Sequence, residues 1–81
     1  MDERRRPPAR KRTFKSGTIA FNRAGGITGI VRNLSDRGAM LEVESVLGIP
    51  DEFTLLIDVD HFKRSCRVIW RRPTRLGVEF I

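Results

Sequence analysis

The chain is a succession of short runs in which apolar and polar residues alternate, separated by residues that favour turns. A period of two is typical of a β-strand with one face in a core and the other in solvent. The clearest run lies at 39–44, where Ala39, Leu41 and Val43 fall on one face. No window of ten or more residues shows the 3.6-residue period of an amphipathic helix. The pattern therefore predicts an all-β chain.

Six strands are expected from the alternation. They lie at 18–22, 27–32, 39–44, 53–57, 62–70 and 76–80. Gly and Asn, which tolerate positive φ, separate the first two strands, and Pro73 interrupts the chain before the last strand. Short strands with regular turn signals favour a small six-stranded antiparallel β-barrel. Closing the sheet into a barrel also removes the exposed strand edges of a small open sheet.

The first fifteen residues show little periodicity and contain Pro7 and Pro8. They predict an extended, flexible arm rather than a helix. Seven Lys or Arg residues against two acids give the arm a net charge of +5, out of +6 for the whole chain. We therefore expect one small domain, made of a basic arm at 1–15 and a nearly neutral barrel at 16–81.

Catalytic and metal-binding signatures are missing from the sequence. One His and one Cys are too few for a zinc site of the usual ligand number. Ser35 and Ser45 have no His nearby in sequence to act as a base, and the glycine fingerprints of phosphate loops and dinucleotide folds are absent. We expect a binding module with no metal and no cofactor, not an enzyme. The apolar runs are also too short for a membrane span.

Two single residues have more than one interpretation. Cys66 cannot form an internal disulfide, which fits a reducing, cytoplasmic location. Its alternating run favours a core-facing small hydrophobe over a reactive thiol. His61 falls in an expected turn beside Asp60, and it is either an exposed turn residue or a residue that contacts a ligand.

Polar residues gather in the turn that joins the second and third expected strands, Asn33-Leu34-Ser35-Asp36-Arg37-Gly38. Asn33 and Ser35 have short side chains that can bond neighbouring backbone groups or face a ligand. Gly38 can take a positive φ and let a ligand approach the main chain closely. The same residue types also favour a plain β-turn, so this segment alone leaves both interpretations open.

The arm contains two arginines four residues apart, Arg6 and Arg10. A guanidinium is planar, always charged and able to bond two acceptors, so it suits phosphate oxygens and the O6/N7 edge of guanine. It also stacks on aromatic faces. The two arginines could hold an anionic purine ligand from two sides, and the alternative is a solvated basic tail.

Taken together, RxxxR followed about twenty residues later by N-x-S-x-x-G resembles the two-part signature of the PilZ domain, a bacterial receptor for cyclic di-GMP. The resemblance extends over the chain and includes the strand Cys66–Trp70 and the closing Leu76-Gly77-Val78-Glu79-Phe80. It implies a six-stranded antiparallel barrel with an N-terminal arm that folds over the ligand.

The resemblance also implies a set of ligand-binding residues, which are Arg5, Arg6, Arg10, Asn33, Ser35 and Gly38. The paired arginines of the arm would contact guanine edges and phosphates of the nucleotide, often bound as a stacked dimer, and Arg5 would add a phosphate contact. Asn33 and Ser35 would hydrogen-bond a guanine, and Gly38 would keep the turn open.

The function expected from this resemblance is a cyclic di-GMP receptor whose arm orders on binding and relays the signal to a partner protein, in regulation of motility or biofilm formation. One alternative is an adaptor of the same fold that binds no nucleotide. Another is a small basic nucleic-acid-binding barrel, which the scarcity of exposed aromatic residues disfavours. A second basic cluster, Trp70, Arg71, Arg72 and Arg75, fits either a solvated turn or a further phosphate or partner contact.

Overall fold

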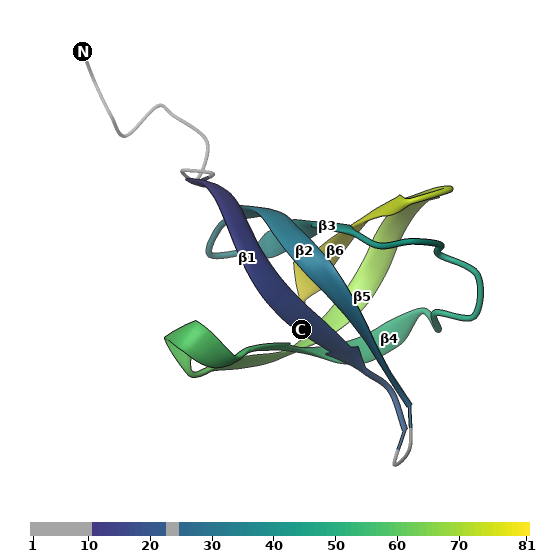
Figure 1. The fold of residues 1–81 in the computed structure, drawn as a ribbon, viewed down its shortest axis with the longest axis horizontal. Helices are drawn as coiled ribbons and strands as arrows, with labels where there is room; N and C mark the ends of the chain where they lie inside the picture. The colour runs from purple at the N-terminus through teal and green to yellow at the C-terminus, as the bar shows by residue number, and fades with distance from the viewer. Residues whose placement is uncertain (1–10, 23–24) are drawn as a thin grey trace.

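The computed structural model describes residues 11–22 and 25–81, and these residues form a closed antiparallel β-barrel of six strands (Figure 1). The strands are β1 (Lys11–Ala20), β2 (Gly26–Leu34), β3 (Gly38–Glu42), β4 (Glu52–Ile57), β5 (Phe62–Arg72) and β6 (Arg75–Phe80). Neighbouring strands follow the order β1-β2-β3-β6-β5-β4, and pairing of β1 with β4 closes the barrel. The predicted all-β barrel is confirmed.

Apolar side chains from every strand fill the barrel. The buried core residues are Ile19, Val31, Leu41, Val43, Ile49, Phe53, Leu55, Ile57, Cys66, Leu76 and Val78. No polar or charged residue is buried within the described ranges. In β3, β4 and β6, the residues that the sequence pattern places on the inner face are the ones that contribute to this core. The pattern therefore assigned the faces of these strands correctly.

The first strand is longer than the alternation predicts, because it begins at Lys11 rather than at Thr18. Lys11 pairs with Leu34 of β2, and the register then shifts between Arg12 and Lys15. Such a shift, as in a β-bulge, keeps two strands paired while interrupting the inside–outside alternation of side chains. Residues 11–15, which the composition places in the arm, therefore belong to the strand.

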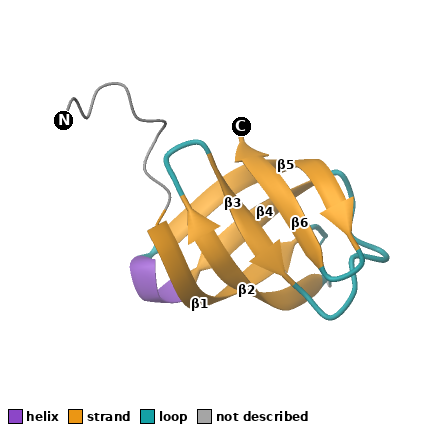
Figure 2. Ribbon diagram, turned by 90° about the horizontal axis from the view of Figure 1, so that it is seen from above, coloured by secondary structure: helices purple, strands orange, loops and turns teal. Residues whose placement is uncertain are grey.

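A 3₁₀ turn, η2 (Asp58–Asp60), connects β4 to β5. Figure 2 shows it in purple beside the beginning of β1, where Lys15 Nζ lies 2.6 Å from Asp60 Oδ2. His61 follows with a φ of 52° and is exposed, as the turn interpretation predicts. Across the described ranges, no helix has the length and apolar character needed to cross a membrane.

Candidate functional site

The turn between β2 and β3 is organised around the hydroxyl of Ser35. Its Oγ accepts the backbone N–H groups of Arg37, at 3.2 Å, and of Gly38, at 3.3 Å. The hydroxyl donates to the carbonyl oxygen of Gly38 at 3.3 Å, and the backbone N–H of Ser35 donates to the same oxygen at 2.9 Å. A hydroxyl has one donor and two acceptor positions, and the turn uses all of them. Ser35 therefore holds the shape of the turn.

Gly38 allows β3 to approach β6 closely. A Cβ atom at this position would overlap the carbonyl oxygen of Val78. Of the described glycines, Gly48 alone has a positive φ, so Gly38 does not use the left-handed conformation that glycine permits. The backbone N–H of Phe80 donates to the carbonyl oxygen of Arg37 at 2.7 Å and ties the turn further to the end of β6.

Asn33 belongs to a row of residues that crosses five strands. Directly paired residues in an antiparallel sheet share a face, so the row follows from the strand registers. Its members are Arg12, Asn33, Met40, Gly77 and Trp70, on β1, β2, β3, β6 and β5. Within the described part of the chain, the half-buried side chain of Asn33 makes no hydrogen bond, so its amide is free to contact a ligand.

A groove of about 310 Å³ lies over this row beside the turn. The indole of Trp70 covers Gly77, where a Cβ atom would overlap the ring. Trp70 is 40% exposed, and the guanidinium carbon of Arg72 lies 5.9 Å from the centroid of its ring. The groove thus places an aromatic face and a cation next to the turn that carries Asn33.

Sequence reasoning missed Trp70 and Met40 as groove residues. Neither lies near Asn33 in sequence, and only the insertion of β6 between β3 and β5 brings the three side chains onto one surface. One available signal is Gly77, because a glycine inside a strand marks a bulge or a close approach. Gly77 belongs to the segment Leu76-Gly77-Val78-Glu79-Phe80, which is part of the resemblance to the PilZ domain.

The groove carries a surplus of positive charge. Arg37 lines it, Arg12 stands at the end of the row, and Arg72 lies over Trp70. None of these three arginines pairs with a carboxylate anywhere in residues 11–22 and 25–81. Glu79 also lines the groove, and its Oε2 lies 3.8 Å from Nη1 of Arg67. Unpaired arginines beside an open groove attract anions.

The arginines expected to bind the ligand, Arg5, Arg6 and Arg10, lie outside the described residues. The first described residue, Lys11, pairs with Leu34 at the edge of the turn. The chain that carries these arginines therefore joins the barrel beside the turn and the groove. The structure brings together Asn33, Ser35 and Gly38, and the contribution of the arm stays a prediction.

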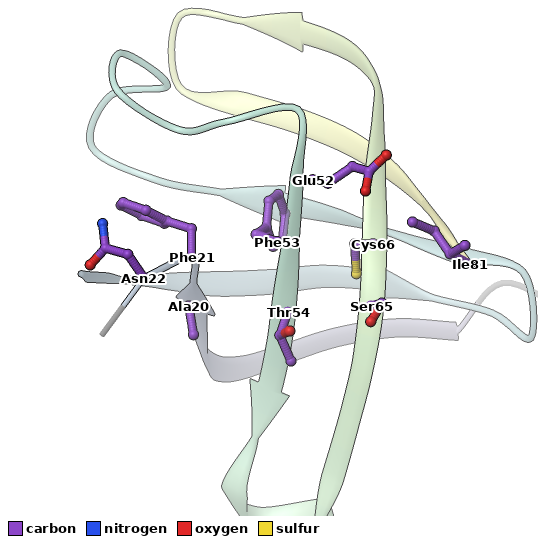
Figure 3. A pocket seen from close by; sticks show the side chains of 9 residues that line it. All are labelled: Ala20, Phe21, Asn22, Glu52, Phe53, Thr54, Ser65, Cys66 and Ile81. Carbon is purple, nitrogen blue, oxygen red and sulfur yellow. The ribbon is translucent and has the colours of Figure 1, made fainter. Parts of the chain in front are cut away.

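A second hollow, of about 420 Å³, lies near the end of β1 and contains none of the expected site residues (Figure 3). Its one charged lining residue is the acidic Glu52, which does not suit an anionic ligand. Cys66 lines its inner side and is fully buried, and desolvation raises the pKa of the thiol to about 11. The prediction that Cys66 faces the core is confirmed.

Comparison with known proteins gives one family. The model of the PilZ domain matches residues 3–81, which span both the arginines of the arm and the Asn33–Gly38 turn. PilZ domains are receptors for cyclic di-GMP, and their role is binding rather than catalysis. None of the curated proteins matches the chain.

Proposed function

The chain belongs to the PilZ domain family, and from this membership we propose that it is a cytoplasmic receptor for cyclic di-GMP. The nucleotide lies over the groove between the Asn33 turn and Trp70, and the basic arm closes over it. The observation that carries the proposal is the row that joins Asn33 to Trp70 across Met40 and Gly77.

The groove has the chemistry that a guanine dinucleotide needs. A base stacked on an exposed aromatic side chain gains about 1–3 kcal/mol. Trp70 offers such a face, and Asn33 offers an amide that can donate to and accept from a guanine edge. Arg37 and Arg72, which pair with no carboxylate among the described residues, supply positive charge for the phosphates.

The arm supplies most of the affinity in this proposal. Arg6 and Arg10 contact guanine edges and phosphates, and Arg5 adds a phosphate contact. By analogy with base readout in DNA, each bidentate contact between an arginine and a guanine is worth about 1–3 kcal/mol. Pro7 and Pro8 reduce the conformational freedom that the arm loses on binding.

We assign two residues of the turn motif a role other than the one that the resemblance implies. The Ser35 hydroxyl is fully used by backbone groups, and Gly38 lies against Val78. We assign both to positioning, so that Asn33 is the direct ligand contact of the turn. Ordering of the arm over the bound nucleotide then presents a new surface to a partner protein.

Calorimetric titration with cyclic di-GMP tests the proposal. We expect Arg6→Ala, Arg10→Ala and Asn33→Ala each to weaken binding at least tenfold, which corresponds to about 1.4 kcal/mol per contact. Lys63→Ala is the matched control, because Lys63 is an exposed cation on β5 that lines neither the groove over Trp70 nor the hollow near the end of β1. The titration also gives the stoichiometry, which separates one nucleotide from a stacked dimer.

Two results would contradict the proposal. Absence of heat at tens of micromolar nucleotide would favour an adaptor that binds its partner without a ligand. Binding of single-stranded nucleic acid with a steep salt dependence, unaffected by Asn33→Ala, would favour a nucleic-acid-binding barrel.

A further inference from the structure

One mouth of the barrel carries cations on its interior face. Lys15 pairs with the buried Val31, and Arg64 pairs with the buried Leu55. Because directly paired residues share a face, both side chains project to the inner side of the sheet. They lie where the barrel is open, and Arg64 is exposed.

Beneath Arg64 the mouth has an aromatic floor. The rings of Phe62 and Phe80 have centroids 5.4 Å apart, and the guanidinium carbon of Arg64 lies 5.0 Å from the Phe80 centroid. With Leu34 they line a cavity of about 510 Å³, which adjoins the groove over Trp70 at Leu34 and Ser35. Cavities of this size at the mouths of β-barrels are common binding sites, and this one combines an apolar floor with polar and charged walls.

The charges at the mouth are unequally satisfied. Lys15 forms an ion pair with Asp60, whereas Arg64 has no carboxylate partner in the described ranges. Asp36 also lines the mouth and forms no ion pair with Arg64. Arg64 is thus the cation that an incoming carboxylate can reach, above a floor that an apolar side chain can cover.

The mouth adjoins the part of β1 that lies beyond its pairing with β4, where η2 lies beside Lys15 and no described strand pairs with the edge that faces away from β2. β1 pairs with β4 only from Thr18 to Ala20, so the stretch 11–17 pairs with β2 alone among the described strands. Thr13 and Lys15 of that stretch line the mouth. An open strand edge can accept an extended segment by main-chain hydrogen bonds, and pockets beside it then select the side chains.

We propose that the mouth and the open edge of β1 together form the docking site for an extended segment of a partner protein. That segment places an apolar side chain over Phe62 and Phe80 and an acidic side chain against Arg64. Side chains two residues apart on a strand share a face, so the partner carries the acidic and apolar residues at alternate positions.

Leu34 and Ser35 line both this mouth and the groove over Trp70. A nucleotide in the groove and a peptide in the mouth therefore both contact the β2–β3 turn, and this shared contact couples the two sites. This coupling, unlike the docking site itself, rests on the proposed nucleotide function. It gives the partner a way to sense whether the nucleotide is bound.

The test uses the full chain and a defined peptide probe. The probe is a capped six-residue peptide with the sequence Thr-Glu-Thr-Phe-Thr-Glu. Its binding to the protein is measured by amide NMR in the absence of nucleotide. We expect saturable shifts at Thr13, Phe62, Arg64 and Phe80, and at least tenfold weaker binding to Arg64→Glu. Lys63→Glu is the matched control, because it makes the same charge change at the adjacent position, which pairs with Leu56 on the outer face.

Four results would overturn the docking site. The first three are the absence of saturable shifts at about 1 mM peptide, which corresponds to no more than ~4 kcal/mol of binding, equal weakening by Lys63→Glu, and shifts centred on Trp70. Tighter peptide binding by the double variant Asp2→Lys, Glu3→Lys would also overturn it, since the chain's own arm would then be the occupant.

The coupling is tested by repeating the titration with saturating cyclic di-GMP. A change in peptide affinity of about threefold or more, which equals about 0.7 kcal/mol, supports the coupling. Unchanged affinity with nucleotide bound overturns the coupling alone. Should the protein bind no nucleotide, the proposed function fails, and the nucleotide-free peptide titration still decides the docking site.

Discussion

Gly38 and the carbonyl oxygen of Val78 lie at backbone contact across the β3–β6 pair, with no room for a Cβ atom between them. The contact stands where the β2–β3 turn ends. The shape of the turn and the closure of the barrel are therefore fixed at one point, and a side chain at position 38 would disturb both.

Gly38→Ala should destabilise the fold by about 1–3 kcal/mol, because the added methyl group meets backbone rather than a mobile side chain. Urea unfolding measures the change. Gly26→Ala is the matched control, because the nearest atom to a Cβ there is a Thr18 methyl carbon at 3.5 Å, an ordinary contact. Equal unfolding midpoints for the two variants would show that β3 and β6 are not held this closely.

Ser35 and Asn33 should respond in opposite ways to substitution by alanine. Ser35→Ala removes the hydroxyl that three backbone contacts use, which should lower the free energy of unfolding by about 1–2 kcal/mol. Asn33→Ala should change the free energy of unfolding by no more than about 0.5 kcal/mol and should lower the affinity for cyclic di-GMP instead. Paired unfolding and calorimetry measurements decide. A stability loss for Asn33→Ala as large as that for Ser35→Ala would contradict these roles.

Gly77→Ala should displace the indole of Trp70, the single tryptophan of the chain. The expected result is a shift in intrinsic fluorescence and weaker nucleotide binding, at a smaller cost in stability than Gly38→Ala. The cost is smaller because the obstructing group is a partly exposed side chain. Addition of cyclic di-GMP should also quench the fluorescence of the unaltered protein. A nucleotide that binds without altering that fluorescence would place the ligand away from Trp70.

Ionisation of the Cys66 thiol should change the free energy of unfolding at alkaline pH. Its pKa is raised from 9.0 to about 11 by burial, so between these values the unfolded chain loses a proton that the folded chain retains. Stability should therefore fall as the pH rises from 9 to 11, by about 2–3 kcal/mol relative to Cys66→Ala. Urea unfolding of both proteins at several pH values tests this. A parallel pH dependence for the two would contradict it.

The sequence predicted the fold well because most strands alternate strictly. Phe53, Leu55 and Ile57 face the core as their period indicates. The beginning of β1 could not be predicted in this way, because the register shift after Arg12 interrupts the alternation. Backbone pairing, which leaves no mark in the pattern of side chains, holds that stretch in the sheet.

The candidate site was predictable only in part. The Asn33–Gly38 turn is local and was visible in the sequence. Its partner Trp70 is brought beside it by a long-range strand order that alternation does not encode. The roles of Ser35 and Gly38 likewise depended on contacts with backbone that residue types alone do not reveal.

The strand order has a consequence for synthesis of the protein. β6 is the last of the described strands in sequence, yet it lies between β3 and β5 and contributes Gly77, which lines the groove. The ribosome releases that strand after all the others, so a nascent chain cannot assemble the groove while β6 is still inside the exit tunnel. The groove is therefore complete only once β6 has left the tunnel, and a nascent chain that lacks β6 has no complete groove.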